Sequence, residues 1–164
     1  MNVLAKNLLG LVFMLLLGVA SSAHANQGQA QMFLQTVSPA SLPETVKVFR
    51  EEVAAAGWSI LNTTNMAGIL STKGHTLAPV LILDVCSGKY SARILAKDEY
   101  RFVTPLMPCR MSIYQTSKGQ VIIARLNAQS MAPMFQGELG EIMSKSGAEL
   151  EQIISKTVAR LAKK

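Results

Sequence analysis

The sequence predicts an α+β fold, in which one domain has a mostly antiparallel sheet with helices packed on one of its faces. Two observations support this prediction. Short segments of alternating apolar residues recur between segments of helical periodicity, and no repeat or low-complexity linker divides them. In addition, the strand-like segments 109–115 and 121–127 are separated only by a short turn sequence that contains a glycine. Such a pair is typical of an antiparallel hairpin.

The first 25 residues have the features of a secretory signal peptide. Lys6 precedes an apolar run from Leu8 to Ala20, and Ala23-His24-Ala25 forms an A-x-A cleavage motif. The run is shorter than the roughly 20 apolar residues that a membrane-spanning helix needs. We therefore expect cleavage near Ala25 and export to the periplasm or the medium, without a stable membrane anchor. The mature chain, residues 26–164, has the length of a single domain.

The charge balance of the mature chain is moderately basic. With Lys6 set aside, 15 Lys and Arg residues face 10 Asp and Glu residues, and the basic residues are scattered. A scattered excess of this size accounts for solubility and for loose attraction to anionic ligands. Exported proteins seldom meet nucleic acid, so no nucleic-acid partner is expected.

The first predicted helix has a signal at each end. The segment Ser41–Glu44 is a capping box with a proline in the first turn, and Gly57 is placed to end the helix as a C-terminal cap. Between them, Val46, Phe49 and Val53 recur at helical spacing and predict the buried face.

The first half also predicts three strands, at 31–37, 58–64 and 77–86, with a loop at 65–76. In the second strand, Trp58, Ile60 and Asn62 alternate onto one side. In the third, the run 80–83 is apolar on both faces. Helices on one side would leave the other face exposed, so self-association as a homodimer is expected, with cover by a loop as the alternative.

The second half predicts a helix at 87–100, a proline-punctuated crossing at 101–108, the hairpin strands 109–115 and 121–127, and a long C-terminal helix. The residues expected to face inward are Cys109, Met111 and Ile113 in the first hairpin strand and Ile122, Ala124 and Leu126 in the second. Gly119 suits a turn position with positive φ. Ser146 and Glu149 resemble a second capping box, so a break in the C-terminal helix is expected at Gly147.

The two cysteines of the mature chain form the first candidate site. Cys86 ends one predicted strand and Cys109 begins the next, so antiparallel pairing would bring both to one end of the sheet. An even cysteine count in an exported protein favours a disulfide, which would stabilise the fold by about 3 kcal/mol. Alternatively, Cys86 lies at a predicted helix N-terminus, where backbone N–H groups stabilise a thiolate. Lys89 and Arg110 would add positive potential to such a thiol centre, although no C-x-x-C motif is present.

A soft-metal site is the third interpretation of these residues. In an extended strand Met107, Cys109 and Met111 point the same way, and a row of thioether, thiolate and thioether suits Cu(I). Further donors that could join them are Met131, Met134 and His75. Methionines at such positions also serve as core filling, which is the alternative. Axial haem ligation by a cysteine or methionine is open as well, without a C-x-x-C-H motif.

The sequence carries no recognisable catalytic constellation. The mature chain has one histidine, no nucleophile elbow and no phosphate-binding glycine loop. Asp84, near the end of an apolar strand, is expected to bond to loop amides or to Arg110 rather than to catalyse. We therefore expect a small accessory or binding domain that is not an independent enzyme. The alternative is a thiol-dependent enzyme or sulfur carrier that uses Cys86.

The strings DVCSGKYSARIL and TPLMPCRMSIYQ, followed by a glycine turn and VIIARLN, resemble the bacterial domain-of-unknown-function family 302. The resemblance covers about residues 45–155. It implies a small β-α-β-rich domain, often dimeric, with a topology similar to the TATA-binding-protein-like class. Members with Cys-Asn-Pro after the strand differ from Cys86-Ser87-Gly88 here. The resemblance implies no agreed activity, and it points toward sulfur or redox biology, with an unknown small ligand or partner protein.

Overall fold

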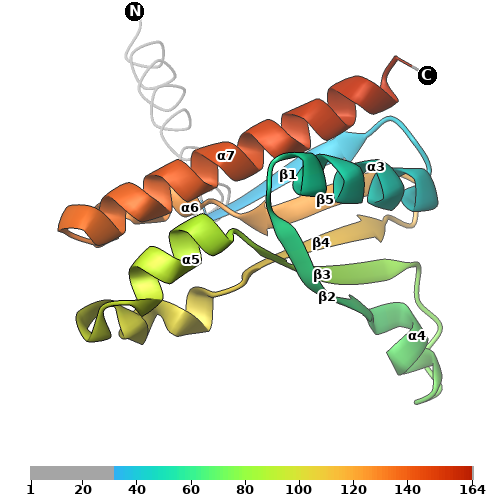
Figure 1. The fold of residues 1–164 in the computed structure, drawn as a ribbon. Helices are drawn as coiled ribbons and strands as arrows, with labels where there is room; N and C mark the ends of the chain where they lie inside the picture. The colour runs from blue at the N-terminus through green and yellow to red at the C-terminus, as the bar shows by residue number, and fades with distance from the viewer. Residues whose placement is uncertain (1–31, 164) are drawn as a thin grey trace, which may run out of the picture. The chain divides into compact units, whose positions relative to one another are not determined.

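The computed structural model describes residues 32–163, and the expected signal peptide lies outside the described residues. Five strands form one antiparallel sheet in the order β1-β5-β4-β3-β2 (Figure 1). Their bounds are β1 Phe33–Ser38, β2 Ser59–Asn65, β3 Val80–Cys86, β4 Cys109–Gln115 and β5 Val121–Leu126. The α+β prediction is confirmed.

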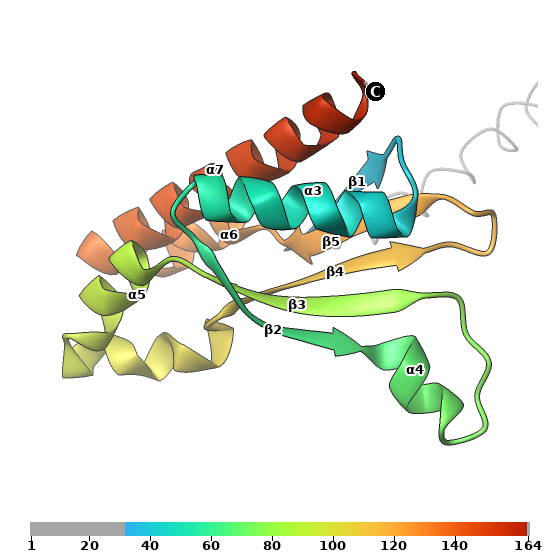
Figure 2. The same cartoon turned by 45° about the vertical axis from the view of Figure 1, so that its right-hand side comes forward.

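The helices gather mainly on one face of this sheet. Their bounds are α3 Leu42–Ala55, α4 Met66–Ser71, α5 Gly88–Leu95, α6 Ala128–Met131 and α7 Gly137–Leu161. Two 3₁₀ helices, η1 Asp98–Leu106 and η2 Ala132–Met134, complete the described chain. Figures 1 and 2 show α3 and α7 side by side over the sheet and α5 beyond the end of β3. The expected helix at 87–100 thus stops earlier, and the expected crossing is helical.

The core lies between the sheet and this helical layer. Its fully buried side chains come from α3, from the three central strands and from α7: Phe49, Val53, Leu83, Val85, Met111, Ile113, Ile123, Ile142 and Ile154. Each apolar side chain buried in this way stabilises the fold by about 1.5–3 kcal/mol relative to its exposed state. This layer therefore holds the central strands in place, and with them the residues at the strand ends.

The ends of α3 follow the predicted capping signals. The Ser41 hydroxyl accepts a hydrogen bond from the backbone N–H of Glu44 at 3.5 Å. At the other end Gly57 has φ +74°, a conformation that favours glycine, and the Trp58 N–H donates to the Val53 carbonyl at 3.0 Å. This tight exit turns the chain back and buries Trp58, which is 5% exposed, at the start of β2.

The predicted inward faces of β5 and β2 were wrong. Ile123 pairs with Ile113 in the antiparallel register, so Ile123 and not Ile122 faces the helical layer. The segment V-I-I is apolar at every position, so the sequence pattern alone did not reveal the phase of β5. In β2 a bulge between Ile60 and Asn62 places Asn62 opposite Asp84, on the other face from Ile60.

The expected break at Gly147 was also wrong. α7 runs without interruption from Gly137 to Leu161, and Gly147 is buried within it. A Cβ atom at Gly147 would lie 3.0 Å from the Ala128 Cβ and 3.2 Å from the Gln129 backbone nitrogen. The glycine therefore allows α6 to approach α7 closely, which is a packing role and not a helix stop.

The other face of the sheet carries several apolar side chains. Phe33 and Val37 of β1 are 47% and 55% exposed there. Ile82 of β3 is half-buried on the same face, whereas Leu83 points into the core. The expected self-association through this face stays a prediction. Among residues 32–163, no helix is both long and apolar enough to cross a membrane.

Candidate functional site

Both cysteines lie at the same end of the sheet, as the order of the strands predicts. β3 and β4 pair antiparallel, and Val85 lies opposite Cys109. Cys86, the last residue of β3, is therefore a diagonal neighbour of Cys109, the first residue of β4. Both cysteines are free thiols in this structure, and both are partly buried. The expected disulfide is thus not formed here.

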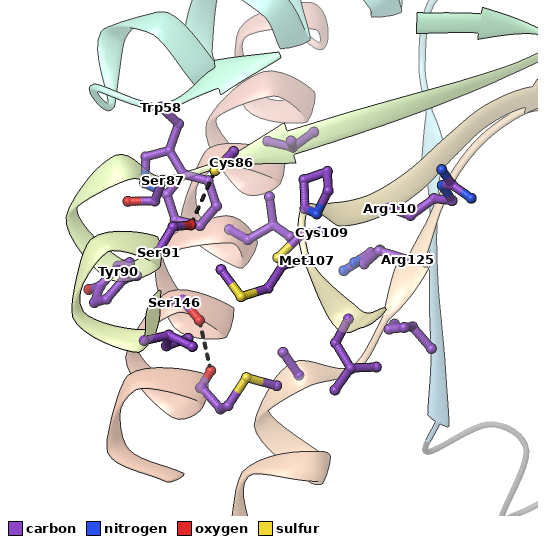
Figure 3. A pocket seen from close by; sticks show the side chains of 18 of the residues that line it. Trp58, Cys86, Ser87, Tyr90, Ser91, Met107, Cys109, Arg110, Arg125 and Ser146 are labelled. Carbon is purple, nitrogen blue, oxygen red and sulfur yellow. Dashed lines mark hydrogen bonds between the residues drawn. The ribbon is translucent and has the colours of Figure 1, made fainter. Parts of the chain in front are cut away.

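Both thiols line one cavity, which we call the sulfur pocket. Its sulfur-bearing side chains are Cys86, Met107, Cys109, Met131 and Met143. The cavity has a volume of about 70 Å³, which is several times the volume that one bound water molecule requires. Figure 3 shows Met107 extending from the β4 side toward α5 and α7, with Cys86 beside Ser91. The remaining walls are mainly aliphatic and aromatic.

The two thiols differ in their surroundings. The Cys86 sulfur lies 3.2 Å from the Ser91 hydroxyl oxygen on the first turns of α5, in a contact where either group can donate. Burial raises the pKa of the Cys109 thiol above its ordinary value of 9.0, and negative charge on Cys86 raises it further. Cys109 is therefore a neutral thiol near pH 7.

The aromatic wall of the pocket is held by Glu149 of α7. Its carboxylate accepts hydrogen bonds from the Tyr90 hydroxyl at 2.7 Å, the Lys89 ammonium at 2.8 Å and the Trp58 indole N–H at 3.2 Å. The Trp58 and Tyr90 rings meet edge to face with centroids 6.3 Å apart. Trp58 and Tyr90 both line the pocket, so one carboxylate orients two of its walls.

This cluster also shifts the titration of its members. The hydrogen bond from Lys89 is the main cause that lowers the pKa of Glu149 below its ordinary value of 4.5, and the Tyr90 and Trp58 hydrogen bonds lower it further. Burial raises the pKa of Tyr90, and the Glu149 carboxylate adds to that rise. Tyr90 is therefore a neutral hydrogen-bond donor and Glu149 a charged acceptor over the whole neutral range.

Of the predicted soft-metal ligands, the structure brings Met107 and Cys109 into the pocket together with Cys86. Met111 does not line the pocket. Its side chain is 2% exposed and packs within the core instead. Met131 lines the pocket, whereas Met134 is 75% exposed outside it and His75 is exposed in the loop after α4.

The predicted supporting charges have separate partners. Arg110 lines the pocket and also donates through Nε to the Asp84 carboxylate at 3.0 Å. That hydrogen bond is the main cause that lowers the pKa of Asp84, and Asn62 adds to it. Asp84 is thus an ion-paired strand residue, as expected. Lys89 does not line the pocket and binds Glu149 instead.

Several residues of the site escaped sequence reasoning, notably Met143, Ser146 and Glu149 on α7. The signal was present, because Met143 and Leu150 are seven residues apart and thus lie on one helical face. The presumed break at Gly147 hid this continuity. Ser91 escaped as well, although its place on the helix that directly follows Cys86 puts it within reach of the thiol.

The fold and the site together define a class of protein, a small α+β domain in which two cysteines line a cavity at one end of an antiparallel sheet. The chain itself belongs to the family described as Domain of unknown function DUF302, whose model matches residues 34–157. This confirms the expected family.

A solved structure of another protein shares the fold. It is the crystal structure of an uncharacterized conserved protein, DUF302, from Bacillus stearothermophilus. The two chains are 22% identical with a TM-score of 0.68, over 77% of this chain and 98% of that one. A search of curated proteins found no match to this chain.

Proposed function

We propose that this protein is an exported, non-enzymatic binding domain whose small, soft ligand contacts the thiols of Cys86 and Cys109 in the sulfur pocket. The observation that carries the proposal is the convergence of both mature-chain cysteines on one cavity, together with three methionines. Thiol and thioether sulfurs are polarisable donors that prefer soft partners. Sulfur or redox metabolism is the biology that fits such a ligand.

The size of the cavity supports a small ligand. Its volume of about 70 Å³ is well below the roughly 300–1,000 Å³ of pockets that hold drug-sized molecules. A haem macrocycle would therefore need the walls to move apart. A single ion or a group of a few atoms fits the available space.

The protonation of Cys109 supports binding rather than nucleophilic chemistry. Thiol-based enzymes and sulfur carriers act through a thiolate. Burial raises the pKa of Cys109, so that thiol is protonated near neutral pH until a ligand displaces its proton. A sulfur carrier that uses Cys86 alone would leave the buried second thiol and the methionines without a role.

The test is thiol trapping on the native protein isolated from the periplasm. N-terminal sequencing should find a start near Asn26, as expected for a cleaved signal. Intact-mass analysis after treatment with N-ethylmaleimide should then show two reactive thiols, with Cys86 modified before Cys109. Ser91→Ala should change the rate at Cys86 and leave the rate at Cys109 unchanged, because only the Cys86 sulfur contacts that hydroxyl.

The opposite result is equally clear. If the native protein is two hydrogens lighter than the dithiol form and neither cysteine reacts before reduction, the pair is a disulfide that staples β3 to β4. Free thiols whose trapping rates match those of the unfolded chain would also contradict the proposal, because a formed pocket must protect at least Cys109.

A further inference from the structure

We infer that the sulfur pocket binds one Cu(I) ion through the thiolates of Cys86 and Cys109 and the thioether of Met107. This inference rests on the proposed function and names its ligand. All three side chains line the same cavity, two from adjacent ends of β3 and β4 and one from the residue before Pro108. Met131 and Met143 line the same cavity from α6 and α7.

The kinds of donor select the metal. Zinc in structural sites takes four ligands from Cys, His and carboxylate side chains. Within residues 32–163, no three His, Cys, Asp or Glu side chains come together in a group that could hold a metal. Thioether sulfurs are poor ligands for zinc, calcium and magnesium ions, but they are good ligands for Cu(I). A set of two thiols and one thioether therefore favours Cu(I) over zinc, calcium or magnesium.

The structure also decides which methionine takes part. By strand alternation Met107 and Met111 are equivalent neighbours of Cys109, two residues to either side. In the fold they are not equivalent, because Met107 precedes the strand and lines the cavity whereas Met111 is packed in the core beside Leu83 and Ile113. Met111 is thus a control that differs from Met107 in placement and not in chemistry.

Charge and protons balance without any redox step. The copper enters and stays as Cu(I), so no electron acceptor is needed. Each thiol that is still protonated gives its proton to solvent as its sulfur binds the metal. Two thiolates and one Cu(I) leave a net charge of −1, and the neighbouring Arg110 side chain is already ion-paired with Asp84. Occupation of both sulfurs would also prevent their oxidation to a disulfide in an oxidising compartment.

The experiment is an anaerobic titration of the reduced, exported protein against the Cu(I)–bicinchoninate complex, whose colour reports the copper that the protein removes. We expect one Cu(I) per chain. Cys86→Ser and Cys109→Ser should each abolish uptake, and Met107→Leu should weaken it by at least about tenfold. Met111→Leu and Met134→Leu should leave affinity within about twofold of the native protein. Because Leu is close to Met in volume, these variants should keep the fold, and circular dichroism checks that they do.

Four outcomes would decide the inference. Equal affinity in Met107→Leu and Met111→Leu would overturn the assigned thioether. Suppose that the reduced, folded protein takes up no copper, although both thiols react with N-ethylmaleimide more slowly than in the unfolded chain. This result would overturn Cu(I) as the ligand and leave the proposal of a thiol-centred binding domain standing. A native disulfide that resists mild reductant would overturn both proposals. Uptake that falls as pH is lowered would support metal bound by thiols that lose their protons.

Discussion

Replacement of Glu149 by alanine should destabilise the domain far more than its position on a helix surface suggests. Tyr90 and Trp58 are 6% and 5% exposed, and both donate a hydrogen bond to this carboxylate. In Glu149→Ala both buried donors lose their acceptor. Hydrogen bonds to a charged group contribute about 1.5–3 kcal/mol each. The Glu149 side chain is 34% exposed, so water replaces part of this loss.

We therefore expect a total loss of about 2–4 kcal/mol of unfolding free energy. A domain of this size has only about 5–15 kcal/mol in all. With a urea m-value of about 1–3 kcal/mol per molar, the unfolding midpoint should fall by about 1–2 M. The assay is equilibrium urea unfolding, followed by circular dichroism and by the fluorescence of the single tryptophan, Trp58. Lys89→Ala is the matched control, because it removes the exposed partner of the same carboxylate and should shift the midpoint little.

Two results would refute this reasoning. If Glu149→Ala and Lys89→Ala shift the midpoint equally, the two aromatic donors do not depend on the carboxylate. If Ser146→Ala, which removes a hydrogen bond to the Met143 carbonyl, lowers the midpoint as much as Glu149→Ala, the two aromatic donors do not account for the loss. The pH dependence gives an independent check. Because the folded pKa of Glu149 is lowered below 4.5, its stabilisation is present above that pH and is lost as pH falls through the folded value. Glu149→Gln should remove this part of the acid dependence.

Three further predictions concern other parts of the structure. Gly147→Leu should lower the free energy of unfolding in urea by about 1–3 kcal/mol, because even a Cβ atom at this position would lie 3.0–3.2 Å from atoms of α6. An unchanged unfolding midpoint would contradict close packing of α6 against α7. Glu151→Leu should cost about 3 kcal/mol, because it leaves the Arg125 side chain, which is 6% exposed, without its carboxylate partner; the double variant Arg125→Met, Glu151→Leu should be more stable than the single one. Alkylation of Cys109 in the native protein should still accelerate above pH 9, because burial raises the pKa of its thiol; a rate that levels off by pH 8 would contradict this.

The sequence alone was sufficient for the features that depend on local chemistry. The capping box at Ser41 and the positive-φ glycine at Gly57 are properties of a few adjacent residues, and both ends of α3 follow them. The glycine turn at Gly119 likewise has φ +81° and joins β4 to β5. The placement of Cys86 and Cys109 at the same end of the sheet also followed, because a strand end and the next strand start share one edge when neighbours pair antiparallel.

Only the tertiary structure decided which residues reach the site among those that occupy equivalent positions in the sequence pattern. Met107 and Met111 have the same spacing from Cys109, yet one lines the cavity and the other fills the core. Ile122 and Ile123 are chemically identical, and only the pairing of Ile123 with Ile113 sets the face of each. Alternation along a strand determines which residues share a face but not which face is covered. That choice depends on where distant helices pack. For the same reason a surface residue of α7, Glu149, orients a pocket wall built from residues more than fifty positions away.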